Sequence, residues 1–188
     1  MILGKWEKGY ALDVHTTSST LISRDADGKP RFRTEHSPMG ELVNRLKYHG
    51  DRSAAAEIIN AAVRFLSPRR ANVDVIVPVP PSNERDFQPV YVVADGIGAT
   101  LRIPVAHCVS TTRAPSQLKG IDTPELRAQA VAGLYTVVAA HVTGKRVLLF
   151  DDVFRSGTTM NAITSVLLDD AKVAKVYALT MTHTRSNR

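Results

Sequence analysis

Cysteine and long apolar runs are scarce in this sequence, and each scarcity excludes a class of protein. Cys108 is the only cysteine among 188 residues, so an intramolecular disulfide and a cysteine-rich zinc site are not expected. No apolar stretch approaches the roughly 20 residues that span a bilayer. The N-terminal stretch MILGKWEKGYALD carries charges where a secretory signal would be apolar. We therefore expect a soluble cytoplasmic protein that does not associate with membranes.

The charge balance is basic without the pattern of a typical nucleic-acid-binding face. The chain has 24 Lys and Arg against 18 Asp and Glu, a net charge of +6 and a pI of about 9.7. Such a balance favours polyanions or heavily phosphorylated small ligands. Aromatic residues make up only 6% of the chain and are not interleaved with the basic ones, as they are where single strands stack. DNA stays open as a partner, and an ordinary solvated surface is the alternative.

Hydrophobic periodicity divides the chain into an N-terminal extension and one α/β domain. Residues 1–37 contain extended segments around an Asp-Gly turn and predict a β-hairpin extension. Residues 38–188 predict the main domain, whose first part is helical. We expect helices from residue 38 onward, at 53–66, 90–101 and 158–170, and strands at 73–79, 103–109, 145–150 and 175–183. This alternation predicts an α/β fold with a mostly parallel open sheet flanked by helices.

The segment VLLFDDVFRSGTTM at residues 147–160 has the features of a sugar-phosphate site. Asp151 and Asp152 follow an apolar strand, at the end where parallel sheets bind ligands. A turn and a helix start then direct N–H groups and hydroxyls at one point, as anion sites do; the residues are Arg155, Ser156, Gly157, Thr158 and Thr159. Two carboxylates beside such a pocket can accept hydrogen bonds from vicinal hydroxyls, which predicts a ribose 5-phosphate. The alternative is a strand end with acidic residues before an ordinary helix.

This segment resembles the 5-phosphoribosyl-1-diphosphate (PRPP) signature of type I phosphoribosyltransferases. With LKYHGD, PVPPSNERDF and TRAPSQLKGIDTPELRAQAVAGLY, it resembles more narrowly the ComF (GntX-like) family over about residues 39–183. The chain departs from that family where RDFQP replaces R-G-F-N-Q, and it lacks the N-terminal four-cysteine zinc module. Arg155 stands where some purine-salvage members carry an aspartate, which argues against a hypoxanthine or guanine acceptor.

Two further segments complete the predicted site. The prolines at residues 78–81 hold the backbone rigid after a strand, which is suited to aim amides at a diphosphate. The resemblance implies a PVP run here, and the candidate binding residues are Pro80, Pro81, Ser82 and Arg85. A plain stiffened turn is the alternative. The resemblance also implies that the polar loop at 110–124 closes over the site, with three basic residues in or beyond it for the diphosphate. These are Arg113, Lys119 and Arg127.

The resemblance implies a transferase that moves the 5-phosphoribosyl group of PRPP to an unidentified nitrogen acceptor and releases pyrophosphate. Asp151, Asp152 and Lys119 are the implied catalytic residues. Magnesium is the implied cofactor, and the two aspartates would contact it indirectly, through ribose hydroxyls or water. The acceptor, expected to be nucleobase-like, has no assigned pocket; Phe154, Tyr135 and the hairpin are candidates.

A homodimer is expected by analogy with other type I enzymes. The alternative functions are a non-catalytic PRPP or nucleotide sensor and a ComF-like accessory factor in DNA uptake or processing.

Overall fold

A four-stranded parallel sheet forms the centre of the protein in the computed structural model, which describes residues 1–25, 27–82, 87–112 and 133–184. The strands run in the order β1, β8, β7, β4, and all neighbours are parallel. Their bounds are Lys8–Val14 for β1, Lys175–His183 for β8, Arg146–Phe154 for β7 and Val75–Pro78 for β4. Parallel strands end at the same edge, so the segments that follow β4 and β7 leave the sheet on one side.

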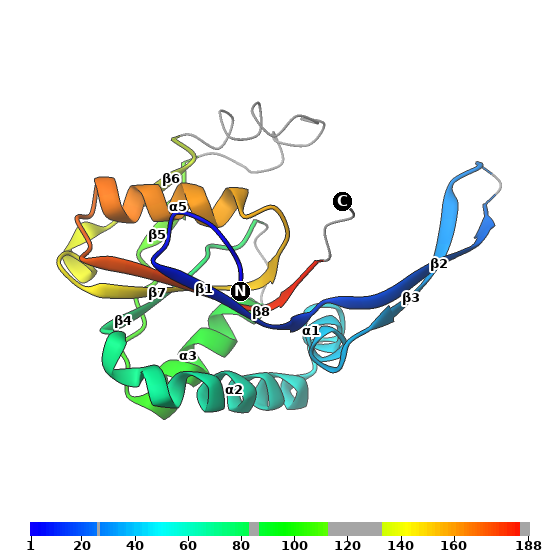
Figure 1. Ribbon diagram of the computed structural model, residues 1–188, viewed down its shortest axis with the longest axis horizontal. Coiled ribbons are helices and arrows are strands. Elements are labelled where there is room, and N and C mark those ends of the chain that lie inside the picture. The colour runs from blue at the N-terminus through cyan, green and yellow to red at the C-terminus, as the bar shows by residue number, and fades with distance from the viewer. Residues whose placement is uncertain (26, 83–86, 113–132, 185–188) are drawn as a thin grey trace.

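Helices cover both faces of this sheet (Figure 1). One face carries α5 (Thr158–Asp169), and the other carries α1 (Pro38–His49), α2 (Arg52–Leu66) and α3 (Pro89–Leu101). Side chains alternate along β7. Val147 and Leu149 enter the core next to α5, whereas Leu148 and Phe150 enter the core next to α1, α2 and α3. Burial on both faces explains why this strand is a continuous apolar run in the sequence.

Smaller elements connect these layers. They are the 3-10 helices η1 (Ser67–Asn72) and η3 (Ala139–His141) and the antiparallel pair β5 (Val109–Thr111) and β6 (Tyr135–Val137). In the part of the chain that the structure describes, none of the helices has the length and apolar character needed to cross a bilayer.

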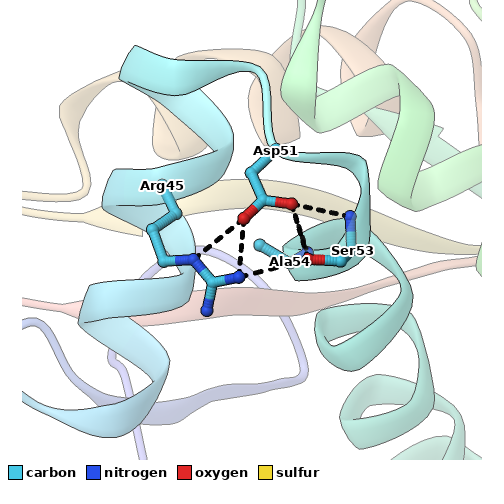
Figure 2. Close-up of polar contacts among 4 residues, drawn as sticks. All are labelled: Arg45, Asp51, Ser53 and Ala54. Atoms are coloured by element: carbon cyan, nitrogen blue, oxygen red, sulfur yellow. Dashed lines mark hydrogen bonds and ion pairs between the residues drawn. The ribbon is translucent and has the colours of Figure 1, made fainter.

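Asp51 holds the corner between α1 and α2 (Figure 2). Gly50 ends α1 in the left-handed region, at φ 63°. One oxygen of Asp51 caps α2 by accepting from the N–H groups of Ser53 at 2.8 Å and Ala54 at 3.4 Å. The other oxygen accepts from Arg45 at 2.6 and 3.0 Å. Hydrogen bonds, from Ser53 first and Arg45 second, hold the pKa of Asp51 well below its ordinary value. The C-terminal end of α1 is therefore fixed.

A two-stranded arm, residues 16–36, projects from the body (Figure 1). It consists of β2 (Thr16–Arg24) and β3 (Pro30–His36), which pair antiparallel and are mostly exposed. The expected Asp-Gly turn lies at its tip, where Gly28 has a φ of 77°. The sequence analysis included residues 8–14 in the hairpin. In the structure they form β1 and pair with β8, because a half-buried edge strand shows the same alternation as a hairpin arm.

The predicted fold class is confirmed, and the predicted helices at 53–66, 90–101 and 158–170 agree with α2, α3 and α5 to within a residue at each end. The predicted strand at 103–109 is wrong in extent. Val105 forms only an isolated bridge with Ile76, and regular pairing begins at Val109. Pro104 has no N–H to donate. The Pro104 carbonyl and the Ala106 N–H form the hydrogen bonds of this segment to Ile76 of β4.

Candidate functional site

A cavity of about 450 Å³ opens at the carboxyl edge of the sheet, where β4 and β7 end. Its walls come from the end of α1, the loop after β4, the start of α3, the β5–β6 pair and the segment from β7 into α5. Seven of the predicted site residues line it: Pro80, Pro81, Ser82, Asp151, Asp152, Arg155 and Thr159. The loop at residues 80–82 and the segment at residues 151–159 therefore line the same cavity.

The two carboxylates of the motif have different partners. Asp152 accepts a hydrogen bond from Lys47 Nζ at 2.7 Å, and its side chain is only 16% exposed. Asp151 Oδ1 accepts from the Asp152 backbone N–H at 2.8 Å. Desolvation, followed by the charge of Asp152, raises the pKa of Asp151 to about 8. Lys47 therefore places a cation directly beside the carboxylate pair.

The turn after β7 is shaped for an anion. Gly157 precedes α5 with a φ of 75°, and no side chain caps the helix. The first N–H groups of a helix have no partner within it, and the helix dipole favours negative charge beside them. The Ser156 and Thr158 hydroxyls lie 2.9 Å from each other. Arg155 and Thr159 line the cavity with the carboxylate pair, whereas Ser156, Gly157 and Thr158 lie in the same turn but are not among the lining residues.

An aromatic pair supports this turn from below. The Phe154 ring packs edge-on against the buried Trp6, with centroids 6.1 Å apart. The same ring lies against Gly157, where an added Cβ would come within 2.8 Å of it. Phe154 was one candidate for the acceptor pocket, but the structure gives it a packing role under the turn.

Aromatic and proline rings also line the cavity. Tyr91 and Tyr135 lie there with Pro89. Burial raises the pKa of Tyr135, and a hydrogen bond with Thr159 partly offsets that increase. The Tyr91 ring packs edge-on against His107, with centroids 4.4 Å apart. Such a wall suits a planar ring, which aromatic side chains bind by stacking or edge contacts.

The loop after β4 continues the sheet before it turns into the cavity. The Val79 N–H donates to the Phe150 carbonyl at 2.9 Å, and Pro80, Pro81 and Ser82 then line the cavity. The described residues contain no cis peptide bond. The rigidity comes from proline rings with trans bonds.

Four predicted ligand contacts lie outside the described residues, and their roles stay predictions: Arg85, Arg113, Lys119 and Arg127. The sequence reasoning missed other lining residues, of which Lys47 makes the shortest contact with the carboxylate pair; Gln88, Tyr91 and Thr111 are further examples. The stretch LKYHGD, which contains Lys47, had been noted only as part of the resemblance. Its role in the site follows from the fold, in which α1 brings Lys47 to Asp152 of β7.

The donor set fits a magnesium ion that arrives on the ligand. Within the described ranges, no group of three or more His, Cys, Asp or Glu side chains could hold a metal ion. Asp152 is paired with Lys47, and Asp151 has a raised pKa. The pair is therefore better suited to hydroxyl groups or metal-bound water than to direct metal coordination.

Comparisons with known proteins agree with this geometry. No protein-family model matches the chain. It is 28% identical to the competence protein ComFC of Bacillus subtilis over 153 residues, which are 79% of this chain and 61% of the relative. The chain thus spans about three fifths of the length of that protein.

Three solved structures show the fold. Adenine phosphoribosyltransferase superimposes with a TM-score of 0.52 and 12% identity, over 89% of this chain and 86% of that chain. Glutamine PRPP amidotransferase from B. subtilis superimposes with a TM-score of 0.51 and 21% identity, over 84% of this chain and 34% of that chain. Orotate phosphoribosyltransferase from Aeropyrum pernix superimposes with a TM-score of 0.50 and 18% identity, over 88% of this chain and 74% of that chain. The chain therefore has the type I phosphoribosyltransferase fold, and its sequence is similar to that of the competence protein ComFC.

Proposed function

We propose that the chain binds PRPP and transfers its 5-phosphoribosyl group to a nitrogen acceptor, with release of pyrophosphate. One observation carries the proposal. A carboxylate pair, a glycine turn at a helix N-terminus and a rigid proline loop, which come from distant parts of the chain, line or border one cavity at the carboxyl edge of the sheet. A ribose that carries a phosphate at one end and a diphosphate at the other needs these three kinds of group.

Each wall of the cavity has a task in this reaction. The turn at residues 155–159 binds the 5-phosphate through N–H groups and hydroxyls. Asp151 and Asp152 accept hydrogen bonds from the 2- and 3-hydroxyls, and their negative charge favours positive charge on the ring in the transition state. The loop of Pro80, Pro81 and Ser82 lies where the diphosphate would leave. Magnesium bound to the substrate neutralises part of the diphosphate charge.

The transfer breaks one bond to ribose C1 and forms another. The bond from ribose C1 to the diphosphate oxygen breaks, and the diphosphate leaves with the electron pair. The acceptor nitrogen forms the new bond to C1 with its lone pair and then loses its proton to water or to a basic group. The wall of Tyr91 and Tyr135 is the surface on which a planar acceptor would lie.

Calorimetric titration of PRPP with magnesium into the native chain tests the binding step. The double variant Asp151→Asn/Asp152→Asn is expected to lose at least about 100-fold in affinity, because two hydrogen bonds to charged groups are weakened. The matched control is Asp169→Asn/Asp170→Asn, which changes two adjacent exposed aspartates at the other end of α5. Equal affinities of all three proteins would contradict the assigned site. Pyrophosphate release, measured with a panel of nucleobases, tests transfer, and binding without release would favour a sensor.

The likeness to a competence protein favours a second candidate, an accessory factor in DNA uptake or processing. The net charge of +6 is compatible with DNA as a partner. DNA binding that weakens steeply as salt is added would support this role, and it could coexist with PRPP binding.

A further inference from the structure

Helix α1 carries a lysine from a distant part of the chain to the carboxylate pair. The helix is held at its start by Ser37, whose hydroxyl accepts from the Gly40 N–H at 2.9 Å. It is held at its end by the Asp51 corner (Figure 2). Val43 and Leu46 are buried against the sheet. Lys47 follows these buried positions and reaches Asp152, which is 105 residues further along the chain.

The ion pair between Lys47 and Asp152 is shorter and less exposed to solvent than an ordinary surface ion pair. Nζ lies 2.7 Å from Oδ2, and the two side chains are 31% and 16% exposed. The pair between Lys175 and Glu7 is a useful comparison, with 3.6 Å between the charged atoms and about half of each side chain exposed. Reduced hydration strengthens a charge-assisted hydrogen bond and makes its removal more costly. The first pair therefore restrains the Asp152 carboxylate much more than a surface pair would.

This restraint matters because the neighbouring carboxylate repels Asp152. Adjacent carboxylates in a partly dry site tend to share a proton, and a protonated carboxyl donates a hydrogen bond where a ribose hydroxyl needs an acceptor. The Lys47 ammonium at Oδ2 fixes the orientation of the Asp152 carboxylate. Lys47 and Asp152 both line the cavity, so the restrained carboxylate is placed where a ligand hydroxyl can donate to it.

We propose that Lys47 is a positioning residue for the ligand sugar: it holds Asp152 through Oδ2 so that this carboxylate accepts a hydrogen bond from a ribose hydroxyl, and it thereby sets the preference for ribose over deoxyribose phosphates. This role rests on the proposed function and adds to it a specificity determinant that acts from α1. The chemical class it selects is a 5-phosphorylated pentose with vicinal hydroxyls.

A double-mutant cycle tests the role. Affinities for PRPP with magnesium, for ribose 5-phosphate and for 2-deoxyribose 5-phosphate are measured for the native chain, Lys47→Met, Asp152→Asn and the combined variant. Lys47→Met is expected to lose about tenfold or more in affinity for the two ribose ligands and little for the deoxy sugar. The combined variant should bind about as weakly as Asp152→Asn alone, because the two residues act through one hydrogen bond.

Two further variants separate positioning from a general effect of charge. Lys47→Arg keeps a donor cation and should restore most of the affinity for ribose ligands. Lys175→Met removes the lysine of the surface pair and should leave all affinities unchanged.

Four outcomes would overturn the inference. An equal loss for ribose and deoxyribose ligands would mean that Lys47 acts on a part that both ligands share, and additive effects in the cycle would mean that it does not act through Asp152. Unchanged affinity in Lys47→Met would remove the role while leaving the proposed function intact. If the native chain binds none of the three ligands, the proposed function fails, and this role fails with it.

Discussion

Gly157 is the single residue on which the shape of the phosphate turn depends most. Its φ of 75° lies in the region that glycine adopts without strain. A Cβ at this position would also meet two ring atoms of Phe154, at 2.8 and 3.0 Å, and that ring is backed by Trp6. Gly157→Ala is therefore expected to lower the free energy of unfolding by about 1–3 kcal/mol, measured by urea denaturation, and to weaken PRPP binding.

Gly144 provides the control for that substitution. It has a similar φ of 69°, but no atom lies within 4 Å of the position that its Cβ would occupy. Gly144→Ala should therefore show the backbone strain alone and leave PRPP affinity unchanged. If both variants were destabilised equally and both bound PRPP like the native chain, the contact with Phe154 would not shape the turn.

At the residue scale, the sequence revealed those parts of the site that are local in the chain. Asp151, Asp152 and Gly157 stand within seven residues, and strand-turn-helix geometry alone brings them together. Lys47 could not be identified as their partner, because its contact depends on how α1 packs against the sheet. The pairing across 105 residues is a tertiary property that periodicity does not encode.

At the scale of elements, the arm is the part least coupled to the fold. Its strands pair with each other and are mostly exposed, including Leu21, Ile22 and Phe32 at 49–57%. We expect that joining Thr16 to His36 through an Asn-Gly turn changes the melting temperature by no more than a few degrees, because little buried apolar surface is lost. PRPP affinity should be retained. A large drop in either quantity would show that the arm supports the site.

The same scale shows where sequence patterns are ambiguous. The predicted helix at 158–170 agrees with α5, because the glycine and the following helical spacing point to one arrangement, whereas β7 continues four residues past the predicted strand at 145–150 and includes Asp151 and Asp152. The alternation at Leu12 and Val14 was assigned to the hairpin, but an edge strand of the main sheet has the same period of two. Only the partner strand distinguishes these cases, and β8 lies at the far end of the sequence.

At the scale of the whole molecule, the site and the stability of the fold are linked through Asp151. Its pKa in the folded protein is raised to about 8, whereas an unfolded aspartate titrates near its ordinary value of about 3.9. Between these values the folded state binds more protons than the unfolded state. The contribution of this group to stability is therefore fully present below about pH 4 and is lost as the pH rises toward 8.

Other titratable groups also make the unfolding free energy depend on pH, and a comparison between the native chain and a variant removes their contributions. Asp51 and Asp74 have lowered pKa values, so their stabilising contributions are lost only as the pH falls below about 4. Burial lowers the pKa of His15, so its contribution increases as the pH rises toward about 6.5, opposite to that of Asp151. The difference between the native chain and Asp151→Asn cancels these common effects.

We expect the unfolding free energy of Asp151→Asn to exceed that of the native chain by an amount that increases from pH 5 to pH 8. One proton of difference limits that increase to about 1.4 kcal/mol per pH unit. Urea denaturation at half-unit pH steps measures it, and Asp169→Asn, at an exposed position on α5, should run parallel to the native curve. Parallel curves for Asp151→Asn would mean that this carboxyl is ionised throughout that pH range. A widening gap would show that ionising this carboxyl destabilises the fold, and that a ligand whose hydroxyls stabilise the carboxylate will bind with release of a proton near neutral pH.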